Sequence, residues 1–344
     1  DTQSSKKHKR ITLKLVRHQM LRDKKRIRKR LLTNGARYLE VTSQRMGKGI
    51  YDTQNNENML KCLVAQRRDY SLGKRANAYR SFFTIAFAAL ALVASLVDND
   101  VLSVFSCLCA IILSIINRHI DDYVVKQKKH AAAIQQYFDA TLFSAALGNV
   151  ASDWSGLPTK TDVVESISDI ENADLEPVKN WYSDYSTLSL TEQVFRCQQT
   201  NIRWDEKIRS EFKWLIAVSS SVILLLLVCI AIVVNPTFVK CISVLAWILP
   251  IADVSFSYYD GLRKDMKRLE SLKQQSSIVE SELSKGETCE AKIINLQKLI
   301  MENRETAVLI PDWYYNKRQS THQRKENRIA DTIQVMSAEG GEER

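Results

Sequence analysis

The sequence lacks the motifs on which the common enzyme classes depend. It contains no G-x-x-x-x-G-K-[ST] phosphate loop, no G-x-S-x-G nucleophile turn, no H-E-x-x-H zinc motif and no kinase signature. The best metal candidate is His119 beside Asp121 and Asp122, and a polar cap at the end of an apolar helix explains this group more simply. We therefore expect a protein that is not an enzyme and that holds no metal or cofactor.

Glycine and proline are also scarce, at 10 and 5 of 344 residues, and no stretch shows a sustained alternation of β-branched and polar residues. Strands therefore have little support, and an all-α fold is expected. The seven cysteines are scattered without a C-x-x-C pair, and four lie inside apolar runs, where a free thiol behaves as a small hydrophobic group. This usage favours a reduced protein that faces the cytosol.

Long apolar runs are confined to two windows. In the second window, Leu215 to Val234 has no charged side chain, and as a helix it is about 30 Å long, which matches the hydrocarbon thickness of a bilayer. After a fold at Asn235-Pro236, the run Thr237 to Tyr259 carries only Lys240 and Asp253. Because these two charges lie near its ends, the window predicts a transmembrane hairpin over residues 212–259.

The first window, 81–117, has two shorter arms, Phe82–Val97 and Val101–Asn117, separated by an acidic turn. Each arm is about 24 to 26 Å long as a helix, so a buried helical hairpin of a soluble domain is the alternative. Basic residues such as Arg80 and Arg118 flank the arms, and basic residues also flank the second window. By the positive-inside rule, both termini are expected to be cytosolic. Together the two windows predict a multi-pass protein with four transmembrane helices in two hairpins.

Long cytosolic helical extensions are expected outside the hairpins. Residues 1–48 carry 16 Lys/Arg against 3 Asp/Glu. This basic extension could bind nucleic acid or anionic lipid, or could be a solvated, disordered segment, and it contains no motif for a specific nucleic acid. The other predicted cytosolic parts are an amphipathic helix over 49–80, a helical region with a loop over 118–211, and C-terminal helices over 260–344.

Local signals divide these cytosolic parts further. Ser189 and Glu192 have capping-box spacing and predict the start of the helix that enters the third span. Gly286 predicts a break, and Pro311 is expected to stop the helix that follows it. Residues 149–180 are expected to be mainly loop, and residues 319–336 a final helix.

Polar residues inside the predicted spans are candidates for a pore. Ser219, Ser220 and Ser221 could line a water-filled pore, but small polar residues also allow helices to pack closely. Asp253 follows Pro250 and could belong to a pore mouth, and a carboxylate at the membrane interface is an equally good interpretation.

A second group of candidates combines cytosolic aromatic and basic side chains, which can stack on bases and hold phosphates. The alternative is that these residues are membrane-interface anchors or core. The candidates for ligand binding or for coupling a signal to the spans are Trp181, Tyr182, Arg196, Asn201, Arg203, Trp204, Asp205, Arg209 and Trp313.

Several short motifs, in this order around four spans, resemble the bacterial SMODS-associated four-transmembrane effectors. They are Asn58-Met59-Leu60-Lys61-Cys62-Leu63-Val64-Ala65-Gln66-Arg67, Leu157-Pro158, Trp181-Tyr182, Cys197-Gln198, Asn201, Trp204-Asp205 and Ile310-Pro311-Asp312-Trp313-Tyr314-Tyr315. The resemblance covers about residues 54–335, and the basic segment before Gly49 departs from the family's usual start.

The resemblance implies a pore-forming effector of an anti-phage system in which a nucleotidyltransferase makes a cyclic oligonucleotide. Such an effector is expected to oligomerise in the bacterial inner membrane, to respond to the cyclic oligonucleotide and to kill the infected cell. The family does not say which residues bind the ligand or whether the nucleotidyltransferase is contacted directly. A non-enzymatic membrane scaffold or channel that recruits a cytosolic partner is the alternative.

Overall fold

A computed structural model describes residues 49–97, 99–147, 157–170, 172–233 and 238–342. The basic extension 1–48, Asp98 of the first predicted turn and the second predicted turn at 234–237 lie outside the described residues. The described part of the chain is helical and contains no strand, so the predicted all-α fold is confirmed for it.

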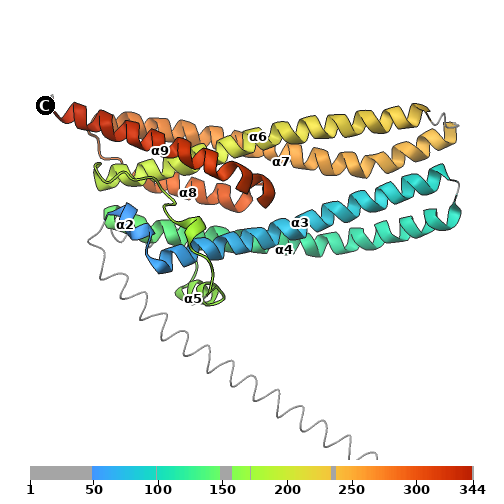
Figure 1. Ribbon diagram of the computed structural model, residues 1–344, viewed down its shortest axis with the longest axis horizontal. Coiled ribbons are helices and arrows are strands. Elements are labelled where there is room, and N and C mark those ends of the chain that lie inside the picture. The colour runs from blue at the N-terminus through green and yellow to red at the C-terminus, as the bar shows by residue number, and fades with distance from the viewer. Residues whose placement is uncertain (1–48, 98, 148–156, 171, 234–237, 343–344) are drawn as a thin grey trace, which may run out of the picture.

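Four long helices form two antiparallel pairs that lie side by side (Figure 1). The pairs are α3 with α4 and α6 with α7, with bounds Glu57–Leu96, Asp100–Leu147, Leu190–Val233 and Phe238–Ser284. Each helix joins a predicted cytosolic stretch to a predicted span without interruption, so the proposed boundaries near residues 81, 118, 212 and 260 fall inside continuous helices. Pro250 lies within α7 and does not end it.

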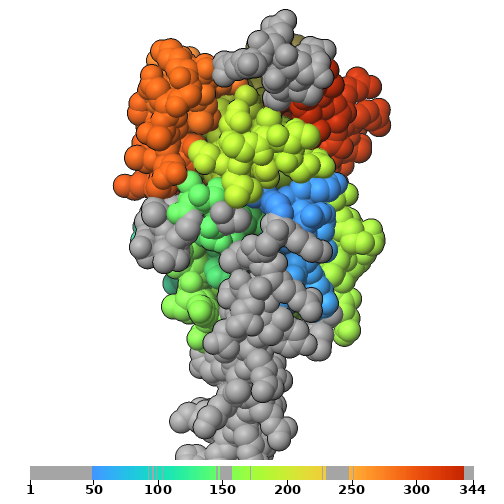
Figure 2. All heavy atoms as spheres, turned by 90° about the vertical axis from the view of Figure 1, so that its left-hand side faces the viewer, coloured from blue at the N-terminus to red at the C-terminus, as the bar shows by residue number. Residues whose placement is uncertain are grey.

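The remaining elements gather at one end of the long helices, which we call the cytosolic body after the location that the sequence predicts for it (Figure 1). They are α2 Ile50–Gln54, α5 Lys160–Ser168, η2 Glu176–Val178, α8 Glu290–Thr306 and α9 Asp312–Glu342. Seen from this end, the first turns of α6 lie between the end of α7 with α8 on one side and α9 on the other (Figure 2). The cytosolic body contains the main apolar core, with Phe138, Phe143 and Phe195 fully buried.

The other end of the long helices, which we call the apolar end, exposes its hydrophobic side chains. Among the described residues, one stretch, Asp100–Ser144, is long and apolar enough to cross a membrane, and only 6% of its most apolar window is buried. A core helix of a soluble protein would be mostly buried, so the exposure argues against the soluble alternative for this arm. The full four-span arrangement stays a prediction.

Local sequence signals set several helix ends. The Ser189 hydroxyl accepts a hydrogen bond from the Glu192 backbone N–H at 3.4 Å just before α6, as predicted. Gly286, with a φ of 77°, follows the end of α7, also as predicted. The expected loop-rich region 149–180 also contains α5, which was not predicted from the sequence and which is capped by a box between Thr159 and Asp162.

The link between α8 and α9 differs from the expectation and passes close to the long helices. Helix α8 already ends at Thr306 and α9 begins at Asp312, well before the predicted residue 319. A Cβ on Gly261 of α7 would lie 2.6 Å from Val308 Cγ2 of the link, so glycine is needed at this contact. The close approach places the link between the core of the cytosolic body and the apolar end.

Candidate ligand cavity

A cavity of about 590 Å³ lies in the cytosolic body, within the size range of small-molecule sites. Its walls come from α3, α6, α7, α8, α9, the link between α8 and α9, and the segment around Trp181, and α4 adds Gln135. The walls α3, α6 and α7 continue directly into the apolar end. The cavity is therefore in contact with helices that also form the apolar end.

The wall formed by α3 is basic and is packed against aromatic rings. The Arg67 guanidinium lies 5.4 Å from the centre of the Trp181 ring, and its Nη1 donates to the Pro177 carbonyl at 3.2 Å. Lys74 Nζ donates to Asp312 Oδ1 at 2.7 Å and lies 5.3 Å from the centre of the Tyr315 ring. Burial lowers the pKa of Lys74, because the charged amine has lost water, although Asp312 opposes this effect.

A buried carboxylate, Asp139 of α4, organises the floor beneath the cavity. The Tyr182 hydroxyl donates to Asp139 Oδ1 at 2.6 Å, while Gln297 Nε2 and Arg304 Nη1 donate to Oδ2 at 2.9 and 2.7 Å. Asn201 Nδ2 donates to the Tyr182 hydroxyl at 2.8 Å. Burial, helped by the neighbouring Asp139 charge, raises the pKa of Tyr182, so this phenol stays protonated.

Arg209 of α6 connects the cavity to α7 and to the link. Its Nη1 donates to Asp265 Oδ2 at 2.6 Å and to the Val308 carbonyl at 2.7 Å, and its Nε lies 2.9 Å from Asp205 Oδ1. Asn303 Nδ2 of α8 donates to Asp205 Oδ2 at 2.8 Å. Burial alone would lower the pKa of Arg209, but the two carboxylates raise it, so the guanidinium remains charged.

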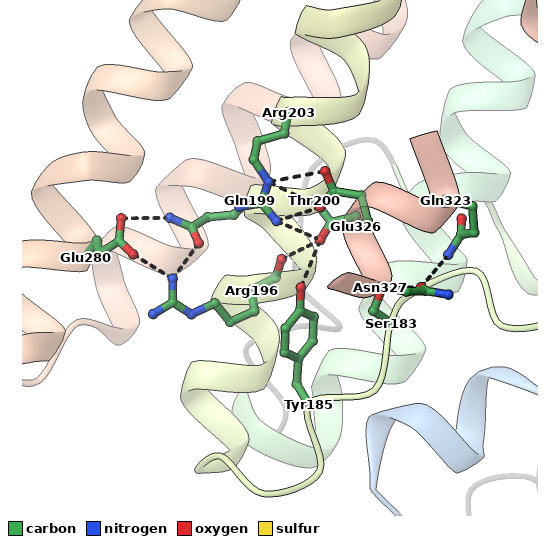
Figure 3. A network of polar contacts seen from close by, with 10 residues as sticks. All are labelled: Ser183, Tyr185, Arg196, Gln199, Thr200, Arg203, Glu280, Gln323, Glu326 and Asn327. Carbon is green, nitrogen blue, oxygen red and sulfur yellow. Dashed lines mark hydrogen bonds and ion pairs between the residues drawn. The ribbon is translucent and has the colours of Figure 1, made fainter. Parts of the chain in front are cut away.

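The structure brings six of the sequence candidates together at this cavity: Trp181, Tyr182, Asn201, Trp204, Asp205 and Arg209. The other three do not line it. Arg196 pairs with Glu280 of α7 at 2.6 Å, and Arg203 donates to Glu326 of α9 at 2.7 Å, so both join helices instead (Figure 3). Trp313 is 61% exposed.

Figure 3 shows how this second network fastens α9 to the rest of the cytosolic body. Arg203 of α6 reaches Glu326, and the Ser183 hydroxyl donates to Asn327 Oδ1 at 2.8 Å. Gln323 Nε2 also bonds Asn327 Oδ1, at 3.2 Å. Because α9 supplies Tyr315 and Gln319 to the cavity wall, these polar contacts hold one side of the cavity in place.

The pore candidates lie away from the cavity, in the apolar halves of α6 and α7. Ser219 and Ser220 are half-buried, Ser221 and Asp253 are exposed, and Ser219 Oγ donates to the Ile216 carbonyl at 3.2 Å. A role for these residues in a pore stays a prediction.

Sequence reasoning missed several lining residues as ligand candidates: Arg67, Tyr70, Lys74, Asn303, Arg304 and Tyr315. Three of them, Arg67, Tyr70 and Lys74, have spacings of three and four residues, which place them on one face of α3. This periodicity was available in the sequence. No comparable signal identified Asn303 and Arg304. Both lie on α8, and α8 meets α4 and the cavity only in the folded chain.

The cavity offers cationic, aromatic and hydrogen-bonding groups, and no cysteine lines it among the described residues. Burial raises the pKa of the Cys62 thiol to about 12 and that of Cys197 well above its usual value, so both thiols stay protonated. Within the described ranges, no three His, Cys, Asp or Glu side chains could together hold a metal ion. The arrangement suits an anionic ligand with aromatic rings.

Comparison with known proteins identifies the chain's relatives. A protein of Bacillus cereus (strain VD146), named as a "Probable CBASS effector molecule", is 26% identical over 291 residues, which are 80% of this chain and 94% of the relative. No solved structure gives a significant match. The SMODS-associating 4TM effector domain matches residues 48–333, most of the sequence, and the chain therefore belongs to the family of SMODS-associating 4TM effectors.

Proposed function

We propose that this chain is a membrane effector of an anti-phage signalling system, which binds a cyclic oligonucleotide in the cavity and permeabilises the inner membrane. The family and the name of the Bacillus cereus relative support an effector role. The observation that carries the proposal is the continuity of the cavity walls α3 and α6 with the exposed apolar end.

The chemistry of the cavity suits this ligand class. Cyclic oligonucleotides combine phosphates with bases, and the cavity combines Arg67, Lys74 and Arg304 with the rings of Trp181 and Tyr315. Stacking on an aromatic ring contributes about 1 to 3 kcal/mol per base, and phosphates bind arginine through charge-assisted hydrogen bonds. A nucleotidyltransferase that supplies the cyclic oligonucleotide is then the functional partner.

The apolar end suits a bilayer. Its exposed residues include Ile111 of α4 and Leu225 of α6, which would face lipid in a membrane. In each helix pair, the last turns of the first helix and the first turns of the second lie at this end, and the last turns of α9 lie at the other (Figure 1). Basic residues such as Arg80 and Arg118 border the cytosolic body, and the positive-inside rule supports the proposal that this body and both chain termini lie in the cytosol.

Binding can drive a change in how the hairpins pack, by way of Arg209. This side chain joins cavity residue Asp205 on α6 to Asp265 on α7, and both helices continue into the apolar end. A nearly complete switch requires that the ligand bind the open state better by about 5.5 kcal/mol. Two to four charge-assisted hydrogen bonds of about 1.5 to 3 kcal/mol each could supply this difference. We propose that the open state is a homo-oligomer.

Dye leakage from liposomes that contain the purified full-length chain tests the proposal. Cyclic dinucleotides and trinucleotides should be added separately, and at least one should release the dye. Trp181→Ala should abolish this response, because it removes a stacking surface of the cavity. Trp313→Ala is the matched control, since Trp313 is exposed and does not line the cavity.

The outcome separates this proposal from a constitutive scaffold. A scaffold would insert into the liposomes and leave the dye inside with every cyclic oligonucleotide. Leakage that is equally strong in Trp181→Ala and in the wild type would show that the cavity is not the sensor.

A further inference from the structure

One corner of the cavity contains hydrogen-bond donors that have no partner. Arg67 Nε and Nη2 are both buried, and neither makes a hydrogen bond of good geometry, although the guanidinium lies near the Tyr315 hydroxyl. These two nitrogens form the side edge of the guanidinium, which matches two oxygens of a phosphate or carboxylate group. Since a buried donor without a partner costs about 1 to 3 kcal/mol, this edge favours a ligand that completes it.

Two further donors, from two other helices, share this corner. The indole Nε1 of Trp204 on α6 is buried and makes no hydrogen bond of good geometry, although the Tyr315 hydroxyl lies near it. Tyr315 of α9 lies beside it, with ring centres 6.1 Å apart. Burial raises the pKa of Tyr315, while the positive charge of Arg67 and the N–H groups of Trp204 and Arg67 near its hydroxyl lower it in part. The corner thus joins α3, α6 and α9 and presents N–H and O–H groups.

The charges around the cavity leave this corner positive. Among the residues that the structure describes, four basic lining residues have a carboxylate within ion-pair distance and two, Arg67 and Arg75, have none. The paired residues are Lys74 with Asp312, Lys179 with Glu176, Arg209 with Asp265 and Arg304 with Asp139. Arg75 is exposed, so Arg67 is the uncompensated cation inside the cavity.

We propose that Arg67, Trp204 and Tyr315 form the phosphate subsite of the cavity, and that it binds one phosphodiester of the ligand side-on. A phosphodiester has two non-bridging oxygens and one negative charge, which match the two free nitrogens and the one unpaired charge of Arg67. The assignment rests on the proposed function, because it takes the ligand to be a cyclic oligonucleotide. Bound there, the phosphate would tie α9 to the two helices that continue into the apolar end.

The test uses the full-length chain in detergent micelles, titrated with cyclic diadenylate, cyclic diguanylate and cyclic triadenylate, with tryptophan fluorescence as the readout. Arg67→Lys keeps the charge and loses the side edge, so it should weaken binding of the active probe at least tenfold. Trp204→Phe keeps the ring and loses the N–H, and should weaken binding several-fold. Arg68→Lys is the matched control: Arg68 is exposed, pairs with Asp169 and should bind within twofold of the wild type.

Each outcome decides one question. If the wild type binds a probe and both cavity variants bind it equally well, the subsite is wrong and the proposed function stands. If the wild type binds none of the three probes, the proposed function itself fails. If inorganic phosphate bound as tightly as the active probe, the proposed phosphodiester subsite would be wrong and the corner would be a general anion site. Should Arg67→Lys lower the melting temperature, Tyr315→Phe decides, because it removes only the hydroxyl of the subsite and keeps the ring; it should weaken binding several-fold without a change in melting temperature.

Discussion

The two ends of the long helices are built on opposite principles. In the cytosolic body, charged groups are buried and paired across helices, as in the contacts of Asp139 with Arg304 and of Arg209 with Asp265. At the apolar end, large hydrophobic side chains such as Ile111 and Leu225 are exposed, and the helices continue without a polar network of this kind among the described residues. The same four helices therefore pass from a protein interior to an exposed apolar surface, which we propose is covered by lipid.

The difference shows where the specificity of the fold is encoded. Apolar surfaces that face lipid pack against many alternative partners, because lipid tails are as apolar as leucine. A buried ion pair tolerates few arrangements, because an unpaired buried charge is costly. We infer that the cytosolic body sets the register of the hairpins and that the apolar end can repack when this register changes.

The largest expected effect comes from removing the central carboxylate of the cytosolic body. Asp139→Ala leaves the Arg304 charge and the Tyr182 hydroxyl without their common acceptor, so it should destabilise the fold by about 3 to 5 kcal/mol. Chemical denaturation in detergent, followed by circular dichroism, measures this loss. Asp121→Ala is the control: Asp121 pairs with Arg80 near the surface, and its loss should cost at most about 1 kcal/mol. Equal losses would mean that buried charge does not distinguish the two ends.

A smaller effect is expected from a charge placed at the apolar end. Ile111→Arg puts a guanidinium near the middle of the predicted second span, which costs about 2.5 to 3.5 kcal/mol if that face meets hydrocarbon. The fraction of protein recovered in washed membranes should fall. Ile278→Arg makes the same change at an exposed position in the cytosolic body, and there recovery should match the wild type. Normal recovery of Ile111→Arg would argue that this arm does not face lipid.

The sequence was sufficient for the long helices because their signals are local. Apolar runs, the capping pair at Ser189 and the helix break at Gly286 each act within a few residues. The start of α9 was missed because no local stop explains why α8 ends at Thr306. The link that follows α8 is instead held by contacts from distant residues, with Asp265 accepting from the Val308 N–H and Arg209 donating to the Val308 carbonyl.

The site was only partly predictable for the same reason. Trp181, Trp204 and Arg209 could be suggested by residue type, because aromatic and basic side chains suit nucleotides. Residue type could not separate Arg209, which lines the cavity, from Arg203, which pairs with Glu326. The distinction depends on where α9 lies, and that is a tertiary property.

The smallest expected effect concerns a histidine that packs between α9 and α6. His322 is 6% exposed, its ring meets Trp204 edge-on at 5.3 Å, and its Nε2 lies 3.7 Å from Glu211 Oε2. Burial lowers the pKa of His322 below its usual value. Lys207 and Arg318 act in the same direction, and Glu211 opposes them in part.

This lowered pKa predicts a loss of stability on acidification. Below the unfolded pKa of about 6.5, the unfolded chain binds a proton that folded His322 still resists, so stability falls as the pH drops through that value towards the lower folded pKa. The melting temperature in detergent, measured at pH 7.5 and pH 5.5, should therefore fall less in His322→Gln than in the wild type. His119→Gln, at an exposed position on α4, serves as the control and should follow the wild type. If His322→Gln lost as much stability as the wild type, the contact of α9 with α6 would be insensitive to this proton, and the acid sensitivity of the cytosolic body would have to arise from its buried carboxylates.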